Sequence, residues 1–479
     1  MKPTYHTATY RNDVLENHLD NPLITGIPSR FELSDAHKRL KAIPAIPDRE
    51  LTSANKLELL TGLEKRVHIP TKHHLDFYTH IYARMIAGYE SRNPMLPEII
   101  EWTLDAADDE PVFVLDDEED TTSTGTSVIG KSGTGKTSTI VSVFRRLFPQ
   151  CIRHTKDNFK DTQITYLIFD MPHNGDTRSL CLNFFKAIDN ALNLSDTEKS
   201  YYAHYSKGKI DAHIMLQKIH FLCRRHHVGI LVIDELQNLL VQPPKKRQIM
   251  LSFLDTLTNQ SHVPIVKIGT SDALHLFKTK KRNIRRKGST FEMSPYAESN
   301  KYWKELLHAL FNFQFAAKPL PDTASNRAFL YELTQGYPYA VLYLWRELQI
   351  DAVNKGKQQK DITHKTIDDI WKKRFPLLRT VFRAIKHHRT GGLNDLLDAQ
   401  HFLDTGYFDQ AIKHLKRMAK DPNIKGRSAE EIASSIDVMM DEVDLNTKQH
   451  EDIEKVKQKL NDKVGALKKG QTYTEGDGA

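Results

Sequence analysis

The sequence is poor in cysteine and has no long apolar run. Its 479 residues include only three cysteines, Cys151, Cys181 and Cys223, which are too widely spaced for a C-x-x-C motif or a disulfide framework. No apolar segment approaches the about 18 residues that a membrane-spanning helix needs. The N-terminus lacks the apolar stretch of a secretory signal. These absences favour a protein of the reducing cytoplasm without a membrane partner.

The sequence has little excess charge, but its charges are unevenly distributed. Its 68 Lys and Arg residues against 61 Asp and Glu give a net charge of +7, which alone does not indicate nucleic-acid binding. Residues 116–120 are all acidic, whereas residues 278–287 contain seven Lys or Arg and no acid. Because phosphate contacts dominate affinity for nucleic acids, the basic segment, with Lys281 and Arg282, is a candidate DNA contact. Ordinary surface charge is the alternative.

Apolar segments of strand length alternate with helical segments through the middle of the chain. This alternation predicts an α/β fold with a parallel sheet that is covered on both faces. The most continuous apolar segment, Val228–Ile233, is typical of a central strand. From about Ser299 onward only helical segments are expected. The other expected strands are Pro111–Leu115, Ser127–Ile129, Ile164–Phe169 and Pro264–Ile268.

The segment Gly130–Thr137 matches the phosphate-binding pattern G-x-x-x-x-G-K-[ST] in full. Glycines allow such a loop to point its backbone N–H groups at phosphate oxygens, and the helix that follows adds the positive end of its dipole. We expect Lys136 to reach the β- and γ-phosphates of ATP and Thr137 to ligate Mg²⁺. The expected nucleotide-binding residues of the loop are Gly130, Lys131, Ser132, Gly133, Thr134, Gly135, Lys136 and Thr137.

Polar residues end two later strands, where ligands bind in open α/β sheets. Asp234 is expected to hold the nucleotide's Mg²⁺ through water, and Glu235 to polarise the attacking water. After the next strand, Thr270 is a candidate contact of the γ-phosphate, although it or Ser271 would equally suit a helix N-cap. Arg285 and Arg286 are candidates for an arginine that completes a neighbouring subunit's site.

These features predict four regions. Residues 1–50, rich in proline, are expected to be an N-terminal extended arm. Residues 51–298 are expected to form an α/β ATPase core with N-terminal helices, and residues 299–375 a helical lid. Residues 376–479 are expected to be a helical C-terminal extension with a disordered tail.

Several stretches of the sequence resemble the TnsC/TniB family, the AAA+ regulators of transposons that use a DDE-type transposase. The resemblance covers roughly residues 15–350. The segment Asn21–Pro28 is similar to the family's N-P-L-I-x-x-L-P element, and Phe169–Asp176 is similar to its D-C-P-x-D-G-S. The other similar stretches are Gly130–Thr137, Phe148–His154, Leu180–Phe185 and Val232–Leu239.

The resemblance implies an ATPase that assembles as a ring or helical filament on double-stranded DNA and connects a TniQ/TnsD-class target selector to the transposase. Hydrolysis would disassemble the homo-oligomer. Arg153, Lys156 and Lys160, in a polar loop after the first core helix, are candidate DNA contacts. The lid segment Gly336–Ala340 departs from the wider AAA+ pattern because it has no arginine that could reach the nucleotide.

The C-terminal helix has an apolar stripe that begins at Ile453. We interpret it as a docking tail for the transposase proteins, with packing on its own domain or a dimer coil as alternatives. Two other functions remain open for the chain. One is a STAND-type signalling or defence ATPase, which would normally carry repeats after the lid. The other is a helicase loader or replication initiator, which would normally add a winged-helix DNA reader.

Overall fold

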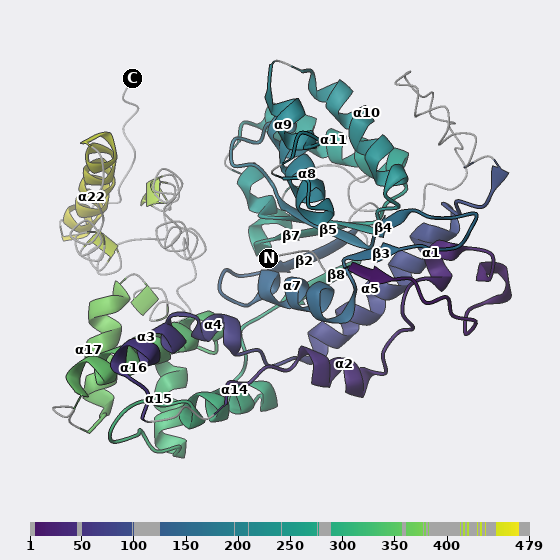
Figure 1. Ribbon diagram of the computed structural model, residues 1–479. Helices are drawn as coiled ribbons and strands as arrows, with labels where there is room; N and C mark the ends of the chain where they lie inside the picture. Colours follow the sequence, from purple (N-terminus) through teal and green to yellow (C-terminus); the bar gives the residue numbers. More distant parts are fainter. Residues whose placement is uncertain are drawn as a thin grey trace. The chain divides into compact units, whose positions relative to one another are not determined.

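In the computed structural model, the chain divides into two compact units (Figure 1). Unit 1 comprises Met1–Lys41, Pro70–Gly130 and Lys136–Met293, and unit 2 comprises Ala42–Ile69, Lys131–Gly135 and Ser294–Ala479. The structure describes residues 5–45, 50–97, 99, 125–195, 197–208, 210–240, 242–274, 276, 289–356, 361–376, 378–379, 382, isolated helical positions between 412 and 436, and 447–468. The expected strand Pro111–Leu115 lies outside these residues.

Unit 1 is built on a parallel sheet in the order β5-β6-β7-β2-β8. All four neighbouring pairs run parallel, which confirms the predicted α/β architecture. The central strands are continuous apolar runs because both faces are covered. The five strands are β2 (Thr126–Gly130), β5 (Tyr166–Asp170), β6 (Ile230–Asp234), β7 (Ile265–Gly269) and β8 (Ser289–Met293).

Successive residues of each central strand belong to different cores, as the period of two requires. On β6, Leu231 and Ile233 join one core, whereas Ile230 and Val232 join the other. The first core is closed by α8 (Thr177–Leu192), α10 (Ala212–Arg225) and α11 (Pro244–Ser261). The second is closed by α1 (Pro22–Thr25), α2 (Leu33–Leu40), α5 (Lys72–Glu90) and α7 (Lys136–Leu147).

The N-terminal segment differs from the extended arm that we expected. Pro22 starts α1, and the Asn21 side chain caps it by accepting from the Leu23 N–H at 3.0 Å. Leu23 and Ile24 are fully buried in the core of unit 1. The segment also contains β1 (Tyr5–Thr7) and a short 3-10 helix (Glu16–His18), and β1 forms a separate sheet in the order β1-β3-β4 with β3 (Cys151–Arg153) and β4 (Thr162–Ile164).

Unit 2 is a helical unit with its own aromatic core. Trp303, Trp345 and Trp371 are each almost completely buried in it. Two helices from the region that we had assigned to the α/β core, α3 and α4, pack against α16 within this unit. The helices are α3 (Ser53–Thr61), α4 (Leu63–Arg66), α14 (Lys301–Asn312), α15 (Ala324–Thr334), α16 (Pro338–Lys355), α17 (His364–Arg374) and α22 (Thr447–Lys468).

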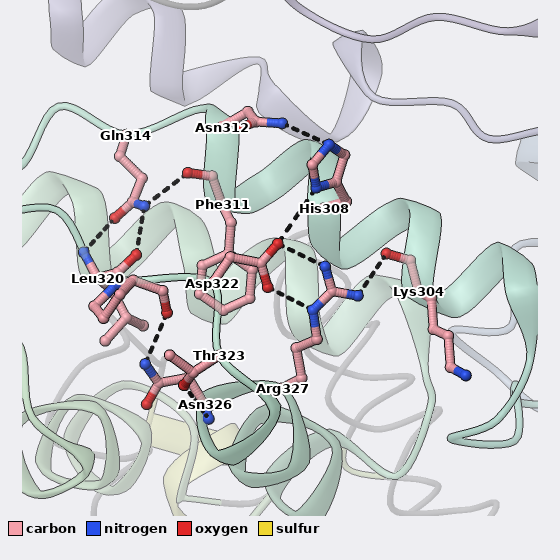
Figure 2. A network of polar contacts seen from close by, with 11 residues as sticks. Lys304, His308, Phe311, Asn312, Gln314, Leu320, Asp322, Thr323, Asn326 and Arg327 are labelled. Atoms are coloured by element: carbon pink, nitrogen blue, oxygen red, sulfur yellow. Dashed lines mark hydrogen bonds and ion pairs between the residues drawn. The ribbon is translucent and has the colours of Figure 1, made fainter.

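A polar network fixes the connection between α14 and α15 (Figure 2). The Asp322 carboxylate accepts from the Arg327 guanidinium at 2.5 and 2.6 Å and lies 3.3 Å from a ring nitrogen of His308. The Gln314 amide donates to two main-chain carbonyls, those of Phe311 at 2.7 Å and Leu320 at 2.9 Å. Gln314 thereby satisfies main-chain carbonyls at the end of α14 and in the loop that follows it.

The apolar stripe of α22 faces the core of unit 2. Ile453, Val456 and Leu460 are buried there, and Val464 packs against the same core. The stripe interpreted as a docking tail is therefore covered by its own unit, and packing on the chain's own domain is the alternative that agrees with the structure. Within the described part of the chain, none of the helices combines the length and apolar character needed to cross a bilayer.

Candidate functional site

The glycine loop connects β2 to α7 with the backbone that its sequence predicts. Gly133 and Gly135 have φ angles of +77° and +90°, which favour residues without a Cβ. The Thr134 hydroxyl donates to the Lys131 carbonyl at 2.7 Å, and the Thr134 N–H donates to the same oxygen at 3.3 Å. Helix α7 starts directly after the loop, at Lys136. The N-terminus of a helix presents N–H groups that suit an anion, as in other anion-binding loops.

The first helical turn after the loop is hydrogen-bonded to the end of β6. The Thr137 hydroxyl donates to Asp234 Oδ2 at 2.6 Å. The other carboxylate oxygen of Asp234 accepts from the Glu235 N–H at 2.7 Å. Asp234 is almost completely buried, whereas Thr137 is exposed. The two residues expected to hold Mg²⁺ therefore already lie in contact.

Glu235 and Thr270 are joined through a third side chain. The Gln237 amide nitrogen donates to Glu235 Oε2, and its amide oxygen accepts from the Thr270 N–H at 3.1 Å. Glu235 has a φ of +58°, the left-handed conformation that only a few non-glycine residues adopt. The Thr270 hydroxyl is buried and meets no hydrogen-bond partner among the described residues, so it does not cap the helical turn Ser271–Leu274.

Two polar residues of this region, Gln237 and Asp170, were not predicted from the sequence. Asp170 ends β5 and pairs in register with Asp234 on β6. Desolvation of the Asp170 carboxyl raises its pKa above the ordinary value, and the negative charge of the neighbouring Asp234 carboxylate raises it further. The signal that would have found Asp170 is its position at the carboxyl end of an apolar strand. No sequence pattern marks Gln237.

The three candidate DNA contacts after α7 fall within residues 153–160 of the sequence and are all exposed. Arg153 ends β3, and its guanidinium lies 4.5 Å from the centre of the Tyr5 ring. The Lys156 ammonium lies 4.2 Å from the centre of the Tyr10 ring. Lys160 forms a 3.6 Å ion pair with the fully exposed Asp157. The four remaining candidates, Lys281, Arg282, Arg285 and Arg286, lie outside the described residues.

The described residues fit a magnesium nucleotide at this place. A hydroxyl and a carboxylate, Thr137 and Asp234, are oxygen donors of the kind Mg²⁺ prefers. The two positive-φ glycines give the loop a backbone that can turn its N–H groups toward phosphate oxygens. The unpartnered hydroxyl of Thr270 is buried at the end of β7, the strand next to β6. Such a group is costly unless a ligand or water satisfies it.

The model of the bacterial TniB protein family matches residues 114–297 of the chain. This segment belongs to the TniB family. The TniB segment contains the glycine loop, Asp234, Glu235, Gln237 and Thr270. The preceding segment Met1–Lys41 of unit 1 lies outside the match, as do most of unit 2 and the whole C-terminal region. No curated protein sequence matches the chain.

Among solved structures, the chain is similar to a Walker-type ATPase of Pyrococcus abyssi, at 11% identity and a TM-score of 0.36 over 71% of this chain and 85% of that one. It is also similar to the Orc1 protein of Aeropyrum pernix in complex with DNA, at 13% identity and a TM-score of 0.38 over 78% and 97%. A replication initiator, DnaA bound to AMPPCP and single-stranded DNA, matches at 13% identity and a TM-score of 0.30 over 78% and 92%. These low TM-scores carry no argument about the fold. The strand order of unit 1, together with the TniB match, identifies an AAA+ type of α/β fold.

Proposed function

We propose that the protein is an ATP-hydrolysing regulator of DNA transposition. In this proposal it assembles as an oligomer on double-stranded target DNA, connects a TniQ/TnsD-class target selector to the transposase, and leaves the DNA when ATP is hydrolysed. The observation that carries the ATPase part is the hydrogen bond between Thr137 and Asp234 beside a complete phosphate-binding loop. The TniB segment supports the transposition part.

Each residue of the site has a definite task in this proposal. The loop backbone and Lys136 bind the phosphates, while Thr137 and Asp234 hold Mg²⁺, which neutralises charge on the phosphate oxygens. Glu235 orients the attacking water and accepts its proton. The carboxylate lies directly after Asp234 in the chain, so the metal ligand and the base are placed by the same strand end. Thr270 contacts the γ-phosphate in this proposal.

The exposed cluster of Arg153, Lys156 and Lys160 is our proposed contact with DNA in unit 1. Long cationic side chains on a surface suit the sequence-independent phosphate contacts that a target-marking protein requires. Arg153 and Lys156 each lie against a tyrosine ring, and this contact restricts the direction of the side chain more than solvent alone would. Lys281 and Arg282 stay proposed DNA contacts from the sequence, and Arg285 and Arg286 stay candidates for the arginine that completes a neighbouring subunit's site.

Electron microscopy with plasmid DNA and a slowly hydrolysed ATP analogue tests the proposal. Continuous coating of DNA that requires the nucleotide is the expected result. Discrete particles that are not bound to DNA would instead favour a STAND-type signalling ATPase. A triple variant, R153A/K156A/K160A, should bind nucleotide normally and lose most of the DNA coating. The triple variant K38A/K65A/K72A, which removes three other exposed lysines, is the matched control for lost charge.

A further inference from the structure

The Gln237 side chain links the ends of two neighbouring strands. It lies on the short 3-10 helix Leu236–Leu239, which follows β6. Its amide contacts the Glu235 carboxylate on one side and the Thr270 N–H on the other. A single neutral side chain thus joins the residue proposed as the base to the main chain of the residue proposed to contact the γ-phosphate.

The orientation of this amide is fixed by chemistry. A main-chain N–H can only donate, so the group that faces Thr270 must be the amide oxygen. The NH₂ group is then left to face Glu235, whose ionised carboxylate can only accept. In the reversed orientation the NH₂ group would face the Thr270 N–H, donor against donor. The amide oxygen would then face the Glu235 carboxylate, acceptor against acceptor. Gln237 is therefore a directed link between the Glu235 carboxylate and the Thr270 main chain.

The strand β7 leaves room for this link. A Cβ built on Gly269, the last residue of β7, would lie 3.3 Å from the Gln237 amide oxygen and 3.1 Å from Leu236 Cβ. It would also lie 3.0 Å from Ala273 Cβ. Such distances are tighter than most contacts of a real Cβ atom, so a side chain at position 269 would crowd the amide against its neighbours. Glycine at this position keeps the path between the two strand ends open.

We propose that Gln237 is a positioning residue for ATP hydrolysis, which holds the Glu235 carboxylate in a fixed direction relative to Thr270. This inference rests on the proposed ATPase function and adds a residue to it. Glu235 needs such support because its backbone is in a left-handed conformation and its side chain has several rotamers. A catalytic base that is displaced even slightly from its reactive position loses much of its contribution to the rate.

Two substitutions of Gln237 test the contributions of its hydrogen bonds to Glu235 and to the Thr270 N–H. Gln237→Met keeps the length of the side chain and removes both hydrogen bonds. Gln237→Glu keeps an acceptor for the Thr270 N–H, but replaces the donor to Glu235 by a second carboxylate. We expect either variant to bind a fluorescent ATP analogue within about twofold of the wild type, and to lose about tenfold or more in kcat for phosphate release with Mg²⁺ and DNA.

A double-mutant cycle with Glu235→Gln distinguishes positioning from packing. If Gln237 acts through Glu235, Gln237→Met should cause no further loss of kcat in the Glu235→Gln protein. A kcat within about twofold of wild type in both single variants, or an equal additional loss in the Glu235→Gln background, would overturn the inference. If Gln237→Met lowers the melting midpoint strongly, Gln237→Glu decides, because its side chain fills the same volume.

The wild-type measurements separate this inference from the function on which it rests. A wild-type protein that neither binds the analogue nor releases phosphate would refute the proposed ATPase function, and the role of Gln237 with it. A wild-type protein that hydrolyses ATP, together with Gln237 variants of normal kcat, would refute the role of Gln237 alone.

Discussion

The Thr137 hydroxyl donates a 2.6 Å hydrogen bond to the Asp234 carboxylate, although 97 residues separate the two in the sequence. In the sheet, β7 lies between β2 and β6. The chain leaves β2 through the glycine loop, and the first turn of α7 then lies beside the carboxyl end of β6. Neither residue alone would indicate chemistry, since a threonine in a first helical turn and an aspartate at a strand end are common. Their contact beside a phosphate-binding loop is what favours a magnesium nucleotide.

Lys136→Ala should weaken nucleotide binding strongly. The ammonium is expected to contact two phosphates, and a charge-assisted interaction of about 1.5 to 3 kcal/mol corresponds to roughly a ten- to hundredfold weaker ATP affinity. The measurement is a titration with a fluorescent ATP analogue. Lys131→Ala is the matched control, because the loop uses the backbone of Lys131, and affinity within a factor of about three is expected. Equal losses in both variants would contradict the role of Lys136.

Glu235→Gln should separate binding from hydrolysis. The substitution keeps the size of the side chain and removes the base, whose contribution is typically about 10²- to 10⁴-fold in rate. ATP affinity should stay near that of the wild type, and the DNA assembly should persist for much longer after ATP is added. Turnover and disassembly are measured together, as phosphate release and as loss of sedimenting DNA complexes. Phosphate release at the wild-type rate would exclude Glu235 as the base.

The stability of unit 1 should depend on pH through Asp161. Its carboxylate accepts from His227 at 3.0 Å and Arg225 at 2.9 Å, and these hydrogen bonds hold the pKa of Asp161 well below its ordinary 3.8. A folded-state pKa below the unfolded one means that the stabilisation is complete above the unfolded value and is lost as the pH falls toward the folded one. Asp161→Asn should therefore lower the urea midpoint near pH 7 and have less effect near pH 3.

Asp157→Asn is the control for this pH dependence. Asp157 is fully exposed and its ion pair with Lys160 is 3.6 Å long, so its removal should change the unfolding free energy by well under about 1 kcal/mol. An Asp161→Asn protein whose stability loss is the same at both pH values would show that the hydrogen bonds do not depend on the ionised carboxylate.

Two glycines of unit 2 should differ sharply in their tolerance of alanine. Gly336 and Gly356 have φ angles of +75° and +50°, so an alanine is strained at both positions. At Gly336 a Cβ would also collide with the Tyr296 carbonyl, whereas at Gly356 it would meet nothing within 4 Å. Thermal melting should show a much larger loss for Gly336→Ala. Similar losses in the two variants would mean that the loop before α16 adjusts freely.

The parts of the fold that the sequence predicted well are those with strong local signals. Val228–Ile233 gave β6 because six successive apolar residues suit only a buried strand or helix, and the polar residues that follow limit its length. The edge strand β8 was missed because its burial alternates and a charged residue, Glu292, lies within it. An edge strand of this kind carries no continuous apolar run.

Other features depend on contacts between distant segments. Tyr5 pairs with Cys151, which lies far from it in the sequence, and no local pattern can indicate such a pairing. The proline-rich start was expected to be extended, yet Pro22 occupies the first turn of α1, where its missing N–H costs nothing. For the site, the phosphate loop and the two acids could be predicted from their spacing. Gln237 could not, because its role depends on the separation of β6 and β7.

The most direct measurement of the central claim is an ATP titration of the full chain with and without Mg²⁺, repeated with Asp234→Asn. The wild type should bind ATP saturably and more strongly with Mg²⁺. In the Asp234→Asn protein Mg²⁺ should lose most of this effect, because residue 234 no longer supplies an anionic oxygen. A wild-type protein without affinity for ATP in the presence of Mg²⁺ would contradict the account.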